Sequence, residues 1–330
     1  MTLPPEFDLI ARHFRPLAGE GALGLSDDAA VFLPPAGRLL VVAADAMVAG
    51  VHFLPEDPAE TVGRKLLRVN LSDLAAMGAA PFGYLMTVSA PRDTPDAWFA
   101  GFAAGLALDQ AEFGVALLGG DTTGTPGPMT LSLTVLGSVA PGCAVLRSGA
   151  EAGDGVWVSG TIGDGALGLD ALQGRVADAD GWLAGRYRVP RPRVALGLGL
   201  HGVASAAMDV SDGLVQDLGH LCRAAGVGPG LGAVIEAERV PLSAAAREAV
   251  GAAVGAAGLE RCLTGGDDYE LLMAVPQARE AALGRVAAAC GVAVTRVGRF
   301  EDARPGDGEA VRVTLGGAAM ALARQGWSHF

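Results

Sequence analysis

Short β-type runs alternate with Ala/Leu-rich helical segments along this chain, and this alternation restricts the possible folds more than any other feature. Residues 58–77 and 94–113 have helical spacing, and in the first of them Leu67, Leu71 and Leu74 recur at intervals of four and three. The strand-like runs around them span 39–44, 82–89, 114–118 and 129–139. The pattern predicts a mixed α/β protein.

A Pro/Gly-containing stretch, VAPGCAVLRSGAEAGD, separates two halves of similar length. The second half begins with a strand-like run at Val156 and continues with helices expected from Gly163, Arg191 and Leu214. No period of about 20 to 50 residues recurs, which excludes solenoids and propellers. A chain of 330 residues that is 51% hydrophobic can bury two cores. We therefore expect two domains, 1–140 and 141–330.

The composition excludes several classes of protein. A net charge of −12 argues against nucleic acid as a partner, because duplex binding depends on clustered Lys and Arg. The apolar stretches are broken well before the roughly 20 residues of a membrane span, and the N-terminal residues do not resemble a signal peptide. Four scattered cysteines fit neither a zinc site nor a disulfide scaffold. We expect a cytoplasmic protein with reduced thiols and without a membrane partner.

Aspartates gather where apolar runs end or beside glycines. Any one of them could be a helix N-cap or a turn residue, a role worth about 1 kcal/mol. Adjacent pairs do not fit that role, because a cap needs one acceptor and two charges about 4 Å apart repel by about 4 kcal/mol near a protein surface. Mg²⁺ supplies a reason, since it binds a few carboxylates together with phosphates. The candidate metal ligands are Asp27, Asp28, Asp45, Asp73, Asp121, Asp209 and Asp212.

Phosphate recognition needs positive charge that this acidic chain scarcely has. Lys65 is the only lysine, and no glycine-lysine pair of a P-loop exists. Arginine, backbone N–H groups or metal ions must therefore neutralise a bound phosphate. The GGDTTG sequence at 119–124 offers flexible backbone that could approach phosphate closely, and Arg147 is a candidate for bidentate binding. These features indicate Mg²⁺ bound together with a polyphosphate.

The chain carries, in order, GLSDDAAVF, DAMVAGVHF, VNLSDLAAMGAAP, LLGGDTTG, VLRSGA, VSGTIGDGALGL, MDVSDGL, TGGDDYELL and a terminal GWSHF. In these motifs it resembles the thiamine-monophosphate kinase family, in the superfamily of aminoimidazole ribonucleotide synthetase and selenophosphate synthetase. The resemblance covers residues 24–330. It implies ATP-dependent phosphorylation of thiamine monophosphate to thiamine diphosphate by direct in-line transfer.

The resemblance also implies a fold and a set of roles. The N-terminal α/β domain is expected to bind ATP and Mg²⁺ and to form a homodimer through its strands, and the C-terminal domain to complete the site. Acids matching the family's magnesium ligands are Asp28, Asp45, Asp73, Asp121, Asp209 and Asp212. Nucleotide-binding positions match Gly120, Asp121, Arg147 and Ser211, and thiamine-side positions match His52, Asp267 and Trp327. Asp73, Asp121, Arg147 and Asp212 are the expected catalytic residues.

The sequence departs from the family at a few positions. Ala43 and Ala44 stand where Ser or Thr usually assists a metal, and Asp267 replaces the usual Glu. Without the resemblance, His52 would more often be a core histidine than a ligand, while Trp327 could equally be a core residue and Asp267 a turn residue. Two alternatives also remain open: a sibling ATP-dependent synthetase that acts on another acceptor, and a non-catalytic protein that binds nucleotide or metal.

Overall fold

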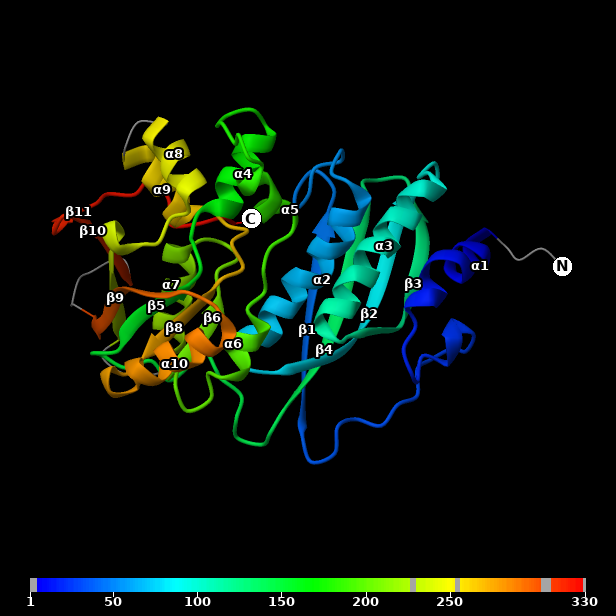
Figure 1. Cartoon of the computed structure of the whole chain (residues 1–330), viewed down its shortest axis with the longest axis horizontal. Coiled ribbons are helices and arrows are strands. Elements are labelled where there is room, and N and C mark those ends of the chain that lie inside the picture. The colour runs from blue at the N-terminus through cyan, green and yellow to red at the C-terminus, as the bar shows by residue number, and fades with distance from the viewer. Residues whose placement is uncertain (1–4, 226–229, 253–255, 304–309, 329–330) are drawn as a thin grey trace. The chain divides into compact units, whose positions relative to one another are not determined.

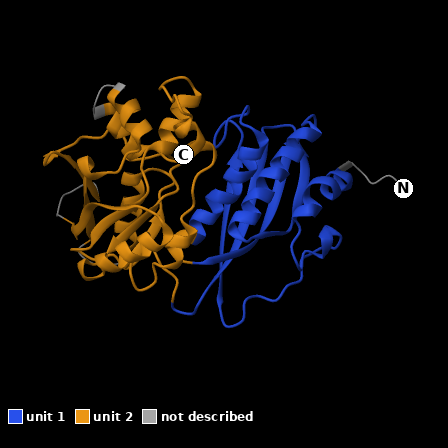
Figure 2. Ribbon diagram, in the orientation of Figure 1, with its two compact units in different colours: residues 1–74, 79–142 blue, residues 75–78, 143–330 orange. Residues whose placement is uncertain are grey.

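The computed structural model describes residues 5–225, 230–252, 256–303 and 310–328. The chain divides into two compact units, one made of residues 1–74 and 79–142 and the other of residues 75–78 and 143–330 (Figure 2). Each unit contains one β-sheet with helices packed on it. The mixed α/β class expected from the alternating pattern is confirmed.

The first unit is built on a four-stranded sheet of order β1-β4-β2-β3. Only β2 and β3 run parallel; β4 is antiparallel to both of its neighbours. The helices that pack in this unit are α1 (Pro5–Leu9), α2 (Ala59–Ala76) and α3 (Asp96–Phe113). Three short helical turns follow α1 and precede β1: η1 (Ile10–Phe14), η2 (Arg15–Leu17) and η3 (Leu23–Leu25). The strands are β1 (Leu39–Val48), β2 (Ala80–Pro91), β3 (Ala116–Thr125) and β4 (Thr130–Val139).

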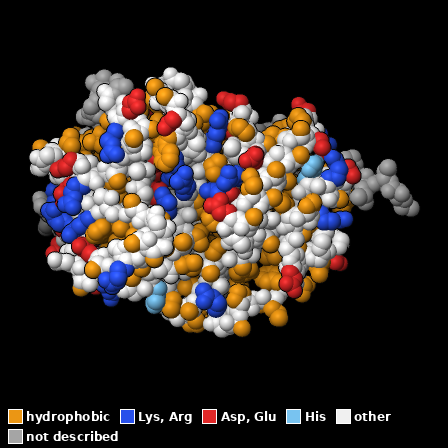
Figure 3. Space-filling model, viewed as in Figure 1, with side chains coloured by type: hydrophobic (Ala, Val, Ile, Leu, Met, Phe, Trp, Pro, Cys, Tyr) orange, Lys and Arg blue, Asp and Glu red, His pale blue; other side chains and the backbone are white. Residues whose placement is uncertain are grey.

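The two faces of this sheet differ in how they are covered. Helices α2 and α3 lie on one face, where alternate residues of β4 such as Leu133 are fully buried (Figure 1). The register places Leu40, Val42 and Leu85 on the other face, where they are 48%, 57% and 42% exposed. Hydrophobic side chains also gather at the lower edge of the unit in the view of Figure 3, where the segment leading into β1 lies.

Three strands of the first unit extend further than the sequence pattern predicts, β2 by two residues at each end and β1 and β3 at their carboxyl ends. Strand β1 continues to Val48, so Asp45 lies inside the strand and not at its end. Strand β3 includes the whole of GGDTTG, whereas the sequence pattern ends the strand at Leu118 and treats GGDTTG as flexible backbone. The reason is pairing with β2, which continues through Thr125 and compensates for the glycines' weak strand preference. A Cβ at Gly120 would lie 1.8 Å from the Met86 carbonyl oxygen, so only glycine fits there.

The second unit contains a seven-stranded sheet of order β11-β10-β7-β9-β5-β8-β6. Its strands are β5 (Gly155–Ser159), β6 (Ala206–Asp209), β7 (Leu231–Glu236), β8 (Leu271–Val275), β9 (Val294–Asp302), β10 (Val311–Leu315) and β11 (Ala318–Ala319). Its helices are α4 (Asp164–Leu172), α5 (Trp182–Arg188), α6 (Val194–Leu198), α7 (Leu214–Ala224), α8 (Ala244–Ala252), α9 (Ala256–Thr264) and α10 (Glu280–Cys290), with the short η4 (Ala237–Arg239) and η5 (Gln277–Arg279).

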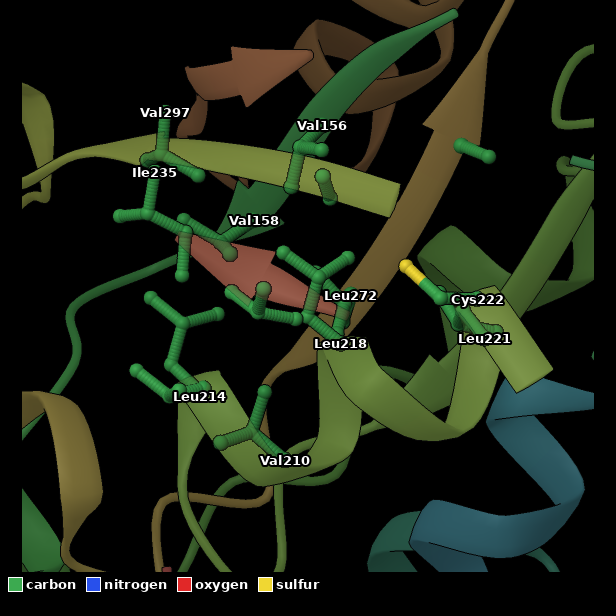
Figure 4. Close-up of a cluster of buried hydrophobic side chains, with 14 of the residues drawn as sticks. Val156, Val158, Val210, Leu214, Leu218, Leu221, Cys222, Ile235, Leu272 and Val297 are labelled. Atoms are coloured by element: carbon green, nitrogen blue, oxygen red, sulfur yellow. The ribbon is translucent and has the colours of Figure 1, made fainter. Parts of the chain in front are cut away.

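Helices cover both faces of this second sheet. On one face, Leu214, Leu218 and Leu221 of α7 pack against apolar strand residues that include Val158 and Leu272 (Figure 4). The alternate residues of the same strands point to the other face, where residues of α6 and α10 cover them. Burial on both faces explains why β8 is apolar throughout. The α7 packing also fixes the start of that helix against the end of β6.

None of the helices in the described part of the chain is long and apolar enough to cross a membrane. The four cysteines are free, as their scatter along the sequence indicates. Burial raises the pKa of Cys222 and of Cys262 to about 12, so neither thiol is reactive at neutral pH.

Candidate functional site

In the first unit, α2 brings two of the predicted metal ligands to one face of the sheet. The Asp45 N–H donates to Asn70 Oδ1 at 3.1 Å, and the Asn70 side chain is fully buried. Asp73 lies three residues further along α2, on the helix face that Asn70 shares. Because Asp45 occupies the register position beside the buried Leu133, its side chain points to the α2 side. Asn70 therefore holds Asp45 within about one helical turn of Asp73.

Asp121 lies on the opposite face of the same sheet. Strand pairing aligns it with Thr87, which in turn aligns with Ser132 of β4. Its carboxylate is exposed, and Oδ1 accepts the N–H of Thr122 at 2.9 Å. The neighbouring Gly120 pairs with Met86 on the covered side. The first unit therefore does not join Asp121 to the face that carries Asp45.

The remaining predicted residues of the first unit lie outside its regular elements. Asp27 and Asp28 are exposed on the segment between η3 and β1. His52 follows β1, and its Nδ1 accepts the N–H of Val48 at 3.0 Å. This bond fixes the ring and places the proton of a neutral imidazole on Nε2. The His52 carbonyl accepts from the buried Lys65 Nζ at 2.9 Å, so a structural role for this turn accompanies any binding role.

Among residues 5–225, 230–252, 256–303 and 310–328, no three His, Cys, Asp or Glu side chains lie close enough together to hold a metal ion by themselves. Mg²⁺ commonly takes only one or two carboxylates from a protein and completes its shell with water and substrate phosphates. Pairs of aspartates are therefore the relevant unit for a phosphate-bound Mg²⁺.

In the second unit, a four-residue turn connects β6 to α7 and carries the DVSDG motif. Strand β6 ends at Asp209, which is buried. The side chain of Asp217, in the first turns of α7, reaches back to this turn. Its Oδ2 accepts the backbone N–H groups of Ser211, Asp212 and Gly213, each at 3.1 Å. One carboxylate oxygen thus binds three consecutive donors of the turn, of which only the last, Gly213 at the N-cap position, belongs to the end of α7.

The carbonyls of the same turn bind two distant segments. The Ser211 carbonyl accepts the N–H of Asp267 at 2.9 Å, and the Asp212 carbonyl accepts the N–H of Trp327 at 3.0 Å. Gln216 of α7 donates to the Trp327 carbonyl at 2.7 Å and to Asp212 Oδ2 at 3.3 Å. The structure therefore brings together four predicted site residues, Ser211, Asp212, Asp267 and Trp327, within the second unit.

The GGDDYE segment has an unusual backbone where it meets this turn. Asp267 and Tyr269 have φ of +71° and +51°, in the left-handed region that non-glycine residues rarely occupy. A Cβ at Gly266 would lie 2.2 Å from the Ser211 carbonyl oxygen, so the close approach of the two segments requires glycine. Backbone strain of this kind persists where surrounding contacts enforce it, commonly at functional sites.

The two adjacent acids of this segment have different environments. Asp268 is buried, and its carboxylate accepts the N–H groups of Gly163 at 2.7 Å and Gly165 at 3.0 Å at the start of α4. Burial raises the pKa of Asp268 to about 8, although these N–H donors oppose the rise. Asp267 is only partly buried. Asp268 is thus an anchor for α4, and Asp267 is the more exposed acid of the pair.

Arg147 is exposed on the segment that runs beside β6. The preceding carbonyl, of Leu146, accepts the N–H of Ala207 at 3.1 Å. The pKa of His220 on α7 is lowered by burial and also by the positive charges of Arg223 and Arg147. Arg147 therefore lies on the α7 side of β6, near the turn that carries Asp212, whose charge acts on the same histidine in the opposite direction.

Three carboxylates interact electrostatically around the β6–α7 turn. The pKa of Asp217 is raised well above its ordinary value, first by burial and then by the negative charges of Asp209 and Asp212. The charges of Asp209 and Asp212 both act on Asp217, so the three acids lie around the same turn. Two carboxylates in such proximity suit a divalent cation bound with phosphate.

Sequence reasoning missed two residues of these arrangements, Asn70 and Asp217. Asn70 shares a helix face with Asp73, which was the available signal. Asp217 follows Gly213 by four residues, and an acid in the first turns of a helix is a recognisable N-terminal signal. Neither pattern could show that the side chain binds the backbone of a neighbouring motif.

Comparisons with known proteins agree with the motifs. Residues 26–139 match the family model described as AIR synthase related protein, N-terminal domain. A thiamine-monophosphate kinase of Caulobacter vibrioides is 46% identical over 99% of this chain and 91% of its own length. The crystal structure of a thiamine-monophosphate kinase from Stenotrophomonas maltophilia superposes with a TM-score of 0.82 at 40% identity, covering 96% of this chain and 98% of the other. The structure of AaThiL complexed with AMPPCP and TMP has a TM-score of 0.77 at 29% identity, covering 92% of this chain and 91% of the other.

Proposed function

The chain belongs to the thiamine-monophosphate kinase family, and on that premise we propose that it transfers the γ-phosphoryl group of ATP to thiamine monophosphate, forming thiamine diphosphate and ADP. The observation that carries this proposal is similarity over almost the whole chain to kinases of this name, at up to 46% identity. A relative that binds AMPPCP, an analogue of ATP, together with TMP supports the same pair of substrates.

The reaction needs positioning more than acid or base chemistry. A phosphate oxygen of thiamine monophosphate, already ionised near neutral pH, attacks the γ-phosphorus of ATP. The new P–O bond forms as the bond to the β-phosphate oxygen breaks, and ADP leaves. We propose a direct in-line transfer, in which the protein aligns donor and acceptor and neutralises negative charge. Arg147 is the cationic side chain proposed to bind the transferred phosphate.

The acids of the two units fit magnesium ions bound with the ATP phosphates. Asp45 lies on the side of the first sheet that α2, the helix of Asp73, covers. In the second unit Asp209 ends β6 and Asp212 follows three residues later, and the charge of each acts on Asp217. These pairs, with Asp121 and the exposed Asp27 and Asp28, are proposed to hold Mg²⁺. Bound Mg²⁺ would neutralise charge on the β- and γ-phosphates.

Further roles follow from the family and are proposed here. His52, Asp267 and Trp327 contact thiamine monophosphate, while Gly120 and Ser211 contact the nucleotide, as do Asp121 and Arg147. The N-terminal domain, residues 1–140, binds ATP and Mg²⁺ and forms the homodimer, and residues 141–330 complete the site. We expect the protein to act in the cytoplasm. The proposed substrate contacts are supported by the hydrogen bonds that join Asp267 and Trp327 to the Ser211–Asp212 turn.

A product assay tests the proposed function directly. Purified protein is incubated with Mg-ATP and thiamine monophosphate, and thiamine diphosphate is measured by chromatography beside reactions that lack acceptor. ADP and thiamine diphosphate in equal amounts are expected. ATP consumption without thiamine diphosphate would contradict the proposal and indicate another acceptor.

The same preparation tests direct transfer. After incubation with γ-labelled ATP alone, the protein is denatured and counted. No label above that of a heat-inactivated control is expected, and stoichiometric protein-bound phosphate would show a covalent intermediate instead.

A further inference from the structure

In the turn between β6 and α7, every backbone N–H and carbonyl group of Ser211 and Asp212 has a hydrogen-bond partner. The N–H groups of Ser211 and Asp212 point to Asp217 Oδ2, and their carbonyls point to the N–H groups of Asp267 and Trp327. The backbone of Val210 is bonded in the same way to residues 269 and 270, at 2.8 Å on each side. The Asp217 side chain thus binds the N–H groups of a turn whose carbonyls bind two other segments.

Capping of α7 does not by itself explain this residue. A helix N-terminus is satisfied by a neutral Ser, Thr or Asn at the N-cap position, without a buried charge. Here Gly213 occupies that position, and the acceptor is a carboxylate that is 1% exposed and close to two other acids. Burying a third acid beside two like charges is costly. In return, the Asp217 carboxylate fixes the orientation of three consecutive backbone N–H groups. It thereby also fixes the side chains and carbonyl groups of these residues.

We propose that Asp217 is a positioning residue that orients the Ser211–Asp212 turn, and through its carbonyls the Asp267 and Trp327 segments, so that the nucleotide and acceptor sides of the reaction are aligned by one side chain. This inference rests on the proposed kinase function. Asp217 touches neither substrate. Removing this carboxylate is expected to lower kcat/KM for both ATP and thiamine monophosphate, because the proposed contacts with both substrates depend on the same turn.

Substitutions at Asp217 can separate the effect of its hydrogen bonds to the turn from the effect of its negative charge. All three N–H groups converge on one oxygen, so the amide oxygen of Asn can replace it, whereas Ala cannot. Asp217→Asn is therefore expected to keep kcat and both KM values within about threefold of wild type. Asp217→Ala is expected to lower kcat/KM for ATP and for thiamine monophosphate by about tenfold or more, since small misplacements are costly in phosphoryl transfer.

The matched control is Asp154→Ala. Asp154 is 6% exposed in the same unit, and its carboxylate also accepts a backbone N–H, that of Glu151 at 3.2 Å, but it lies outside the proposed site. This variant is expected to lose thermal stability while kcat and both KM values stay at wild-type level. Kinetics are measured at least about 10 °C below the unfolding midpoint of each variant, so that a merely structural role changes stability only.

Each outcome decides the question. Wild-type kinetic constants in folded Asp217→Ala, or equal losses in Asp217→Asn and Asp217→Ala, would overturn the positioning role. If Asp217→Ala does not fold, Asp217→Glu replaces it: this variant keeps the charge but displaces the oxygen, and a loss of about tenfold is expected, while unchanged constants overturn the inference. Absence of thiamine diphosphate with wild-type protein would instead refute the proposed function. Calorimetric Mg-ATP affinity of the same variants would then still test the positioning role.

Discussion

At the scale of residues, the structure separates acids that the sequence pattern could not distinguish. The doubled acid at 267–268 splits into an anchored Asp268 and a partly exposed Asp267. Motif spacing placed Asp209 and Asp212 around one serine, and in the structure the charges of both act on Asp217 of α7. It could not predict that Asp121 and Asp45 point to opposite faces of their sheet, because a face is set by strand register and not by the motif itself.

Asp73→Asn and Asp212→Asn test the proposed metal ligands. Each change keeps the side-chain volume and removes the charge, so turnover is expected to fall about 100-fold or more while the unfolding midpoint stays near wild type. Activity is measured across a range of Mg²⁺ concentrations. Asp93→Asn, an exposed acid on the turn between β2 and α3, is the control that should retain full turnover. Near-normal activity of either variant at low Mg²⁺ would refute its assignment as a ligand.

Asp170 provides a test of stability against pH. Burial alone would raise the pKa of its carboxyl, but hydrogen bonds from Arg261 and Arg175 lower it below the ordinary value. A lowered pKa in the folded state means that the stabilisation is present above the ordinary pKa and disappears as pH falls through the folded value. Asp170→Asn should therefore cost about 1.5–3 kcal/mol at pH 7 and progressively less below about pH 4. Chemical denaturation of wild type and variant at pH 7 and below about pH 4 measures the difference in unfolding free energy. An equal loss of stability at the two pH values would contradict the prediction.

At the scale of elements, helices were predicted well and strand ends poorly. The expected helices at 58–77 and 94–113 match α2 and α3 within about two residues, because their apolar spacing continues to their ends. The strand expected at 114–118 continues to Thr125, since pairing with β2 extends it through glycines that have no strand preference of their own. The helix expected from Arg191 is only the short α6, Val194–Leu198.

Contact between α2 and α3 depends on glycines. A Cβ at Gly105 would lie 2.0 Å from the Glu60 carbonyl oxygen, and one at Gly63 would lie 2.4 Å from that of Phe102. Gly→Ala inside a helix usually stabilises by about 0.5–1 kcal/mol, but Gly105→Ala should destabilise by about 1–3 kcal/mol because the helices must separate. Gly284→Ala in α10, where a Cβ meets nothing within 4 Å, is the control expected to stabilise. Thermal unfolding of both variants checks the opposite signs.

At the scale of the whole molecule, the apolar open face of the first sheet is the feature that a monomer does not explain. This face carries Leu40 and Val42 on β1 and, across β4, Leu85 on β2, each at least 42% exposed. Contiguous exposed apolar surface commonly marks an interface. The partner that covers this face belongs to the proposed homodimer.

Val42→Asp tests that interface. A charge in the middle of the face should convert a wild-type dimer to a monomer, as measured by sedimentation at matched concentration, with the far-UV circular dichroism unchanged. Leu108→Asp is the control: Leu108 is 51% exposed on α3, which covers the other face of the sheet, so the dimer should persist. A wild-type monomer, or a Val42→Asp dimer, would refute association through this face.

The saturated backbone of the β6–α7 turn has a consequence for how such a site can change. Main-chain groups and Asp217 hold the turn, so the side chains at 211 and 212 can be exchanged without dismantling the frame that carries them. The backbone of the turn therefore keeps its conformation while the side chains that it carries at 211 and 212 can differ. New ligand chemistry, evolved or engineered, can be introduced at two positions while the geometry between donor and acceptor is retained.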